Sequence, residues 1–121
     1  MLAEDFIERK RSEINNEIKI RDIKRTGHRK YIKEAITLLK SENLQHKVFS
    51  LERLRLFDQT SDLAYNVDTV GEVQYRIGYY IVGQIGNKNN KWTWGQYTPM
   101  ISKNDFEKLI DLAKQEGTYI L

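Results

Sequence analysis

The side chains with the strongest chemical character in this chain are cations that crowd into one short segment. Between residues 19 and 33 the only anion is Asp22, although the net charge of the whole chain is only +3. Lysine and arginine bind phosphate groups, and such contacts weaken as salt rises. A charge run can equally be an ordinary solvated surface. The segment predicts a nucleic-acid site whose residues are Lys19, Arg21, Lys24, Arg25, Arg29, Lys30 and Lys33.

A second group of candidates is aromatic and lies between residues 75 and 97. Both tryptophans and four of the seven tyrosines fall there. Exposed aromatic side chains on a sheet can stack on bases or on other flat groups. Cross-strand pairing inside a core is the commoner use of such residues. The ligand patch predicted here consists of Arg76, Tyr80, Trp92 and Trp94.

The sequence contains no complete catalytic or metal-binding pattern. It has no cysteine, and its two histidines, His28 and His46, do not have the spacing of a metal-binding pair. The Gly83-Gln-Ile-Gly86 turn lacks the lysine of a phosphate-binding loop. We therefore predict no catalytic residue, no metal and no cofactor, and a protein that acts by binding. The alternative is a small-ligand binder or an enzyme with its pocket at the aromatic hairpin.

The N-terminal third predicts two helices. Residues 2 to about 25 lack glycine and proline and carry only a thin apolar stripe, which includes Ile7, Ile14 and Ile18. Such a polar helix suits a partner, so we expect a second copy or another protein to bind there. After a break at Thr26-Gly27, residues 29–42 place Ile32, Ala35, Ile36 and Leu39 on one helical face.

The rest of the chain predicts strands and one more helix. Residues 48–57 fit a strand or a short helix, and the alternation of leucine with arginine favours a strand. A short strand is expected at 63–67. The aromatic hairpin follows, and the core face of its first strand is expected to be Tyr75, Ile77, Tyr79, Ile81 and Ile85.

The C-terminal helix has clear start and stop signals. Ser102 resembles the first residue of a capping box, and Gly117 stands where a helix commonly ends. Its expected buried face is Phe106, Leu109, Ile110 and Ala113.

These elements predict one α+β domain over residues 1–121. Residues 1–45 are its helical N-terminal segment. Residues 46–121 hold an antiparallel meander of three or four strands and a C-terminal helix packed on that sheet. The chain shows no secretory signal and no apolar run of membrane-spanning length. We therefore expect no membrane partner and a cytoplasmic location, with which the lack of cysteine agrees.

Overall fold

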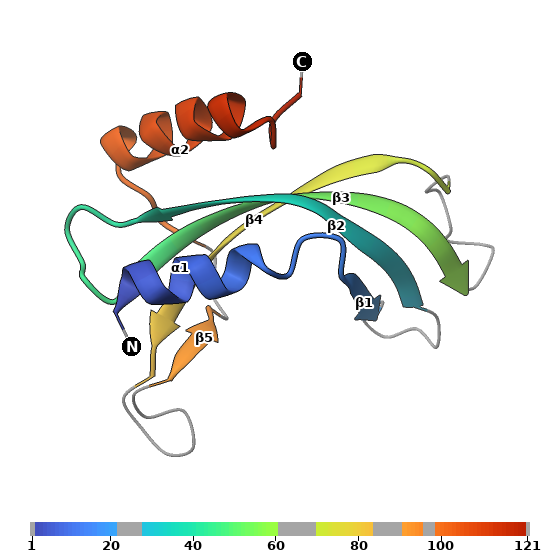
Figure 1. Cartoon of the computed structure of the whole chain (residues 1–121), viewed down its shortest axis with the longest axis horizontal. Helices are drawn as coiled ribbons and strands as arrows, with labels where there is room; N and C mark the ends of the chain where they lie inside the picture. The colour runs from blue at the N-terminus through green and yellow to red at the C-terminus, as the bar shows by residue number, and fades with distance from the viewer. Residues whose placement is uncertain (1, 22–27, 61–69, 84–90, 96–98, 121) are drawn as a thin grey trace.

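The fold is a curled antiparallel sheet between two helices (Figure 1). The computed structural model describes residues 2–21, 28–60, 70–83, 91–95 and 99–120. The strands lie in the sheet in the order in which they occur along the chain. The elements are α1 (Ala3–Arg11), β1 (Glu17–Arg21), β2 (His28–Lys40), β3 (Lys47–Thr60), β4 (Val73–Val82), β5 (Trp92–Trp94) and α2 (Lys103–Glu116).

The α+β class and the antiparallel sheet are confirmed, but the described residues form one N-terminal helix and not two, and five strands and not three or four. The first helix ends at Arg11, and Asn15 then adopts the left-handed conformation (φ 74°) that leads into β1. The predicted second helix is β2. The predicted break at Thr26-Gly27 lies outside the described residues, as does the strand expected at 63–67.

Two physical reasons explain why β2 resembles a helix in sequence. The strand is covered on both faces, by α1 on one and by α2 on the other, so apolar residues occur on both faces and do not alternate. The pairing of β2 with β3 also shifts between Lys33 and Ala35. Such a bulge changes the phase of any remaining alternation.

The concave face of the sheet binds α1. Phe6 of α1 is fully buried there, its ring stacked on Trp92 at a centroid distance of 4.7 Å and edge-on to Tyr80 at 5.0 Å. Ile36 and Leu38 of β2 belong to the same cluster. Ile7 of the predicted apolar stripe also packs against this cluster, whereas Ile14 is 37% exposed, so the sheet covers only part of the stripe and a partner there stays a prediction.

The convex face binds α2, whose ends follow the sequence signals. The Ser102 hydroxyl accepts a hydrogen bond from the Asp105 N–H, and Gly117 adopts the left-handed conformation (φ 77°) at the other end. Leu109 and Ala113 are buried against the sheet as predicted. Phe106 is 45% exposed, so the predicted buried face of this helix is wrong at its first position.

The strand prediction for 48–57 is confirmed by β3, but the face prediction for the hairpin is wrong in part. Tyr79 is buried beneath α2, whereas Tyr75, Ile77 and Ile81 on the same face are 40%, 42% and 38% exposed. Tyr80, expected on the open face, is buried beneath α1. The reason is that each helix covers only part of its side of the sheet.

Candidate functional site

The four residues of the predicted ligand patch do lie together, on the concave face. Tyr80 pairs with Trp94 across the two strands, and their rings meet edge-on at 4.9 Å. The Arg76 guanidinium lies 4.8 Å from the Trp94 ring. Trp92 stacks on Phe6. The contacts just given hold α1 and β5 to the sheet, and a ligand role for this patch stays a prediction.

A buried cluster of charges next to this patch was not predicted. The Glu52 side chain is fully buried and accepts a hydrogen bond from Arg76 Nε at 2.6 Å. Its other oxygen lies 2.8 Å from Lys33 Nζ, an ion pair without good hydrogen-bond alignment. Lys33 also reaches Glu13 at 3.2 Å. Three charges on three strands meet here, and only the strand register places them together.

Burial and the nearby charged cluster both affect the pKa of Tyr80. Burial raises the pKa of its phenol well above the ordinary value, and the nearby Glu52 carboxylate raises it further. The hydroxyl therefore stays protonated at neutral pH. A neutral phenol in a protein core suits a structural role as well as a binding one.

The described residues of the predicted basic segment, 19–21 and 28–33, lie in the paired strands β1 and β2 and not in helices; these two strands form a β1–β2 ribbon. The register of β1 and β2 puts Lys19 directly opposite Lys30 and Arg21 directly opposite His28. Ile18 packs against the core on the other face of the ribbon. Among the described residues, no carboxylate forms an ion pair with Lys19 or with Lys30.

The other members of the basic segment separate in the structure. Lys33 is buried against Glu52 and is not free to bind phosphate. The Arg29 guanidinium lies 5.9 Å from the Tyr31 ring. Lys24 and Arg25 lie outside the described residues. Among the described members of the segment, the buried Lys33 is thus removed from the predicted cationic surface.

A site that the sequence analysis missed is the free edge of β2. β1 pairs with β2 only as far as Ile32, and the Asn15 N–H and the Asn16 C=O extend this contact to Lys33. Beyond that point, no described residue pairs with residues 34–40 on this side. An unpaired edge presents a row of backbone donors and acceptors that another strand can bind.

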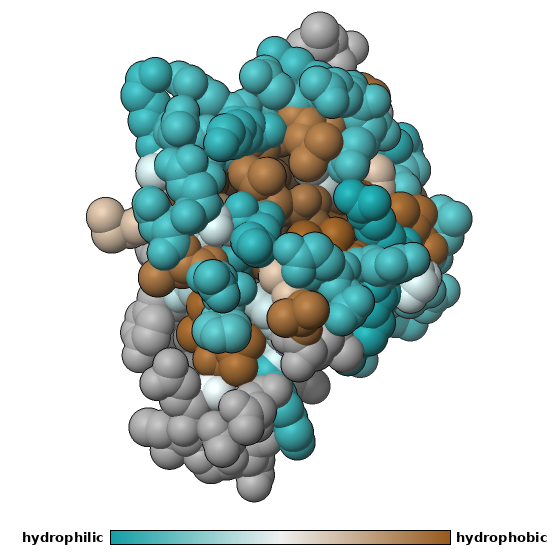
Figure 2. All heavy atoms as spheres, turned by 60° about the vertical axis from the view of Figure 1, so that its left-hand side comes forward, coloured by the Kyte–Doolittle hydropathy of each residue, from teal (hydrophilic) through white to brown (hydrophobic). Residues whose placement is uncertain are grey.

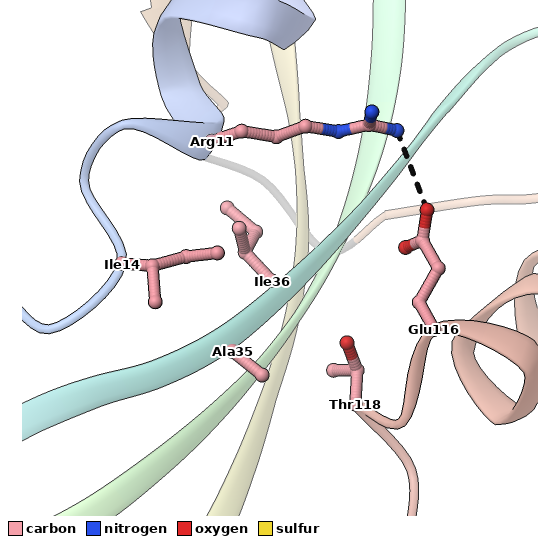
Figure 3. Close-up of a pocket in the computed structure, with 6 residues that line it drawn as sticks. All are labelled: Arg11, Ile14, Ala35, Ile36, Glu116 and Thr118. Atoms are coloured by element: carbon pink, nitrogen blue, oxygen red, sulfur yellow. Dashed lines mark hydrogen bonds and ion pairs between the residues drawn. The ribbon is translucent and has the colours of Figure 1, made fainter.

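The two helices flank this edge and form a shallow pocket over it. The pocket has a volume of about 190 Å³ and lies between the end of α1, β2 and the end of α2 (Figure 3). Ile14, Ala35 and Ile36 give it an apolar floor and side. Figure 2 shows, on one face of the molecule, apolar side chains gathered in a hollow between hydrophilic ones.

An ion pair crosses the mouth of the pocket. Arg11 Nη2 lies 3.3 Å from Glu116 Oε2, which joins the last turns of the two helices across β2 (Figure 3). The other oxygen of Glu116 accepts a hydrogen bond from the Thr37 hydroxyl at 2.8 Å. Thr37 in turn lies 2.8 Å from the Thr118 hydroxyl. Chain position alone could not reveal this arrangement, because it joins residues from both ends of the sequence.

Other kinds of site find no support in the described part of the chain. There, no group of three histidine, aspartate or glutamate side chains could hold a metal ion. No helix among the described residues is both long and apolar enough to cross a membrane. No protein-family model, curated protein or solved structure matches this chain.

Proposed function

We propose that this protein is a non-enzymatic binding domain of the cytoplasm, whose partner is an extended segment of another protein that adds a strand to β2. The observation that carries the proposal is the edge at residues 34–40, which pairs with no described residue and has a pocket with an apolar floor beside Ala35 and Ile36. Strand addition obtains affinity from backbone hydrogen bonds and specificity from pockets for alternate side chains. This edge offers both.

The size of the pocket favours a peptide over a small-molecule ligand. Pockets for drug-sized molecules measure about 300–1,000 Å³, whereas this one measures about 190 Å³. It can hold one apolar side chain of an incoming strand. Ala35 keeps the pocket open, because a larger residue there would fill it.

The proposed partner surface lies at the end of the first helix and not along it. Arg11 and Ile14 line the pocket, whereas Phe6 is fully buried in the core. A second copy fits less well than another protein. Antiparallel pairing of two β2 edges centred on Thr37 would bring the two Glu116 carboxylates together, and like charges repel at such a contact.

The test is selection of a phage-displayed library of random ten-residue peptides against the full chain. We expect enriched peptides to alternate apolar and polar residues and to slow hydrogen exchange of amides in residues 34–40. Ala35→Arg should abolish binding, whereas the matched control Ile77→Arg, on the exposed convex face of β4, should not. A library without enrichment, or peptides that protect only β4, would refute the proposal.

A second candidate function is nucleic-acid binding by the β1–β2 ribbon. The observation that favours it is the direct opposition of Lys19 to Lys30, since like charges placed opposite each other destabilise a sheet unless an anion bridges them. A two-stranded ribbon also fits the major groove of DNA. We expect duplex DNA binding at about 50 mM salt to be lost at about 300 mM. Lys19→Glu with Lys30→Glu should abolish it, whereas Lys103→Glu with Lys108→Glu on α2 should not.

A further inference from the structure

The ion pair at the mouth of the pocket also indicates the chemistry of the partner strand. We infer that the partner strand carries a lysine or arginine that replaces Arg11 at the Glu116 carboxylate, and that the Arg11–Glu116 ion pair competes with the partner until it binds. The inference rests on the proposed function, because it specifies what occupies the same edge.

Glu116 is the fixed half of the ion pair. Its side chain is 28% exposed, and one oxygen is held by the hydroxyl of Thr37, a β2 residue within the free edge. Thr37 is itself buried and held by Thr118, which follows the end of α2. The carboxylate therefore keeps its position at the edge whether or not Arg11 is present.

Arg11 is the movable half of the pair. Its side chain is 51% exposed, and it ends the short helix α1. Its contact with Glu116, at 3.3 Å, is its only ion pair to a described residue. An exposed pair of this kind contributes little stability, because solvent screens it and a long side chain must be ordered. A binding strand can therefore displace Arg11 at small cost.

Once a strand displaces Arg11, the Glu116 carboxylate needs another cation as its partner. The ion pair crosses β2 beyond Ile36 (Figure 3), where the Thr37 hydroxyl donates a hydrogen bond to Glu116, so a strand added along residues 34–40 must take the place of the arginine. Glu116 is then covered by the strand with one oxygen unpaired. A buried carboxylate without a counterion is costly, and a charge-assisted hydrogen bond removes the cost. Arg53, which contacts the residues after the end of α2, is already bonded to the carbonyl groups of Gly117 and Thr118 and to Glu34.

Two neutral variants, Arg11→Gln and Glu116→Gln, test the role of each residue of the ion pair separately. The probes are a peptide selected on the wild-type chain and the same peptide with its basic residue changed to glutamine. We expect Arg11→Gln to raise affinity for the basic peptide up to about fivefold, because the competing cation is gone. Glu116→Gln should lower it about tenfold or more, because the charged acceptor is gone. Both variants should bind the glutamine peptide slightly better than the wild-type chain does.

The decisive result is that Arg11→Gln raises the affinity for the basic peptide while Glu116→Gln lowers it. If the pair only fastened the two helices together, both variants would change affinity for the basic peptide in the same direction, and the inference would be wrong. Selected peptides without any lysine or arginine would also overturn it while leaving strand addition intact. Failure to select any peptide would instead refute the proposed function. Thermal unfolding of both variants checks that each is folded.

Discussion

Replacing Glu52 by alanine should destabilise the fold by about 3–5 kcal/mol, the usual cost of breaking a buried ion pair by removing one partner. Glu52 is fully buried, and its removal leaves Lys33, 3% exposed, without its nearest counterion. Small domains have a total stability of about 5–15 kcal/mol. Urea unfolding followed by tryptophan fluorescence should therefore show a much lower midpoint or no folded baseline.

Two controls separate burial of the charge from loss of a side chain. Glu107→Ala breaks the exposed Lys103–Glu107 pair on α2 and should change the free energy of unfolding by less than about 1 kcal/mol. Lys33→Met combined with Glu52→Leu removes both buried charges and should recover most of the lost stability. A single Glu52→Ala variant as stable as the wild-type chain would mean that water solvates this cluster.

Replacing Phe6 by alanine should cost about 3–5 kcal/mol, the usual range for a fully buried aromatic ring. The ring lies between Trp92 and Tyr80 and joins α1 to the concave face. Its loss leaves a cavity that the curled sheet cannot close. We expect a lower urea midpoint together with a changed tryptophan fluorescence spectrum, because Trp92 loses its stacking partner.

The matched control is Phe106→Ala on α2. Phe106 is 45% exposed, so the same substitution should change stability by only about 0.5 kcal/mol. Equal effects of the two substitutions would contradict the packing of α1 on the sheet. They would also revive the prediction that the first helix binds a partner along its apolar stripe.

Local signals predicted the parts of this fold that local contacts determine. The cap at Ser102 and the stop at Gly117 set the limits of α2, and both act within one helical turn. The alternation of Leu54 and Leu56 with arginines predicted β3, since those arginines lie on the opposite face of the sheet from the buried leucines.

The sequence misled where a strand is covered on both faces. Ile32, Ala35, Ile36 and Leu39 in β2 fit a helical period because apolar residues are needed on both faces and a bulge shifts their phase. In β4 the pattern could not show that one helix would cover Tyr80 and the other Tyr79.

The candidate site was least predictable, because its parts are far apart in the chain. The four residues of the predicted ligand patch lie together, but their role in binding a ligand stays a prediction. The β2 edge could not be predicted, because residues 29–42 were predicted to be a helix. The Arg11–Glu116 pair could not be predicted either, because the two residues are 105 positions apart in sequence. The cluster around Glu52 likewise depends on register, which composition does not contain.

The matching of strand order to chain order has a consequence for how the protein is made. Each hairpin can pair as it leaves the ribosome, since no strand waits for a later one to be inserted beside it. The helix α1 is made before the sheet, yet Phe6 cannot stack on Trp92 until Trp92 has been synthesised. At about 5–20 residues per second that interval lasts several seconds. The edge of β2 is therefore bare on a nascent chain, and both helices can close around it only after α2 has been synthesised.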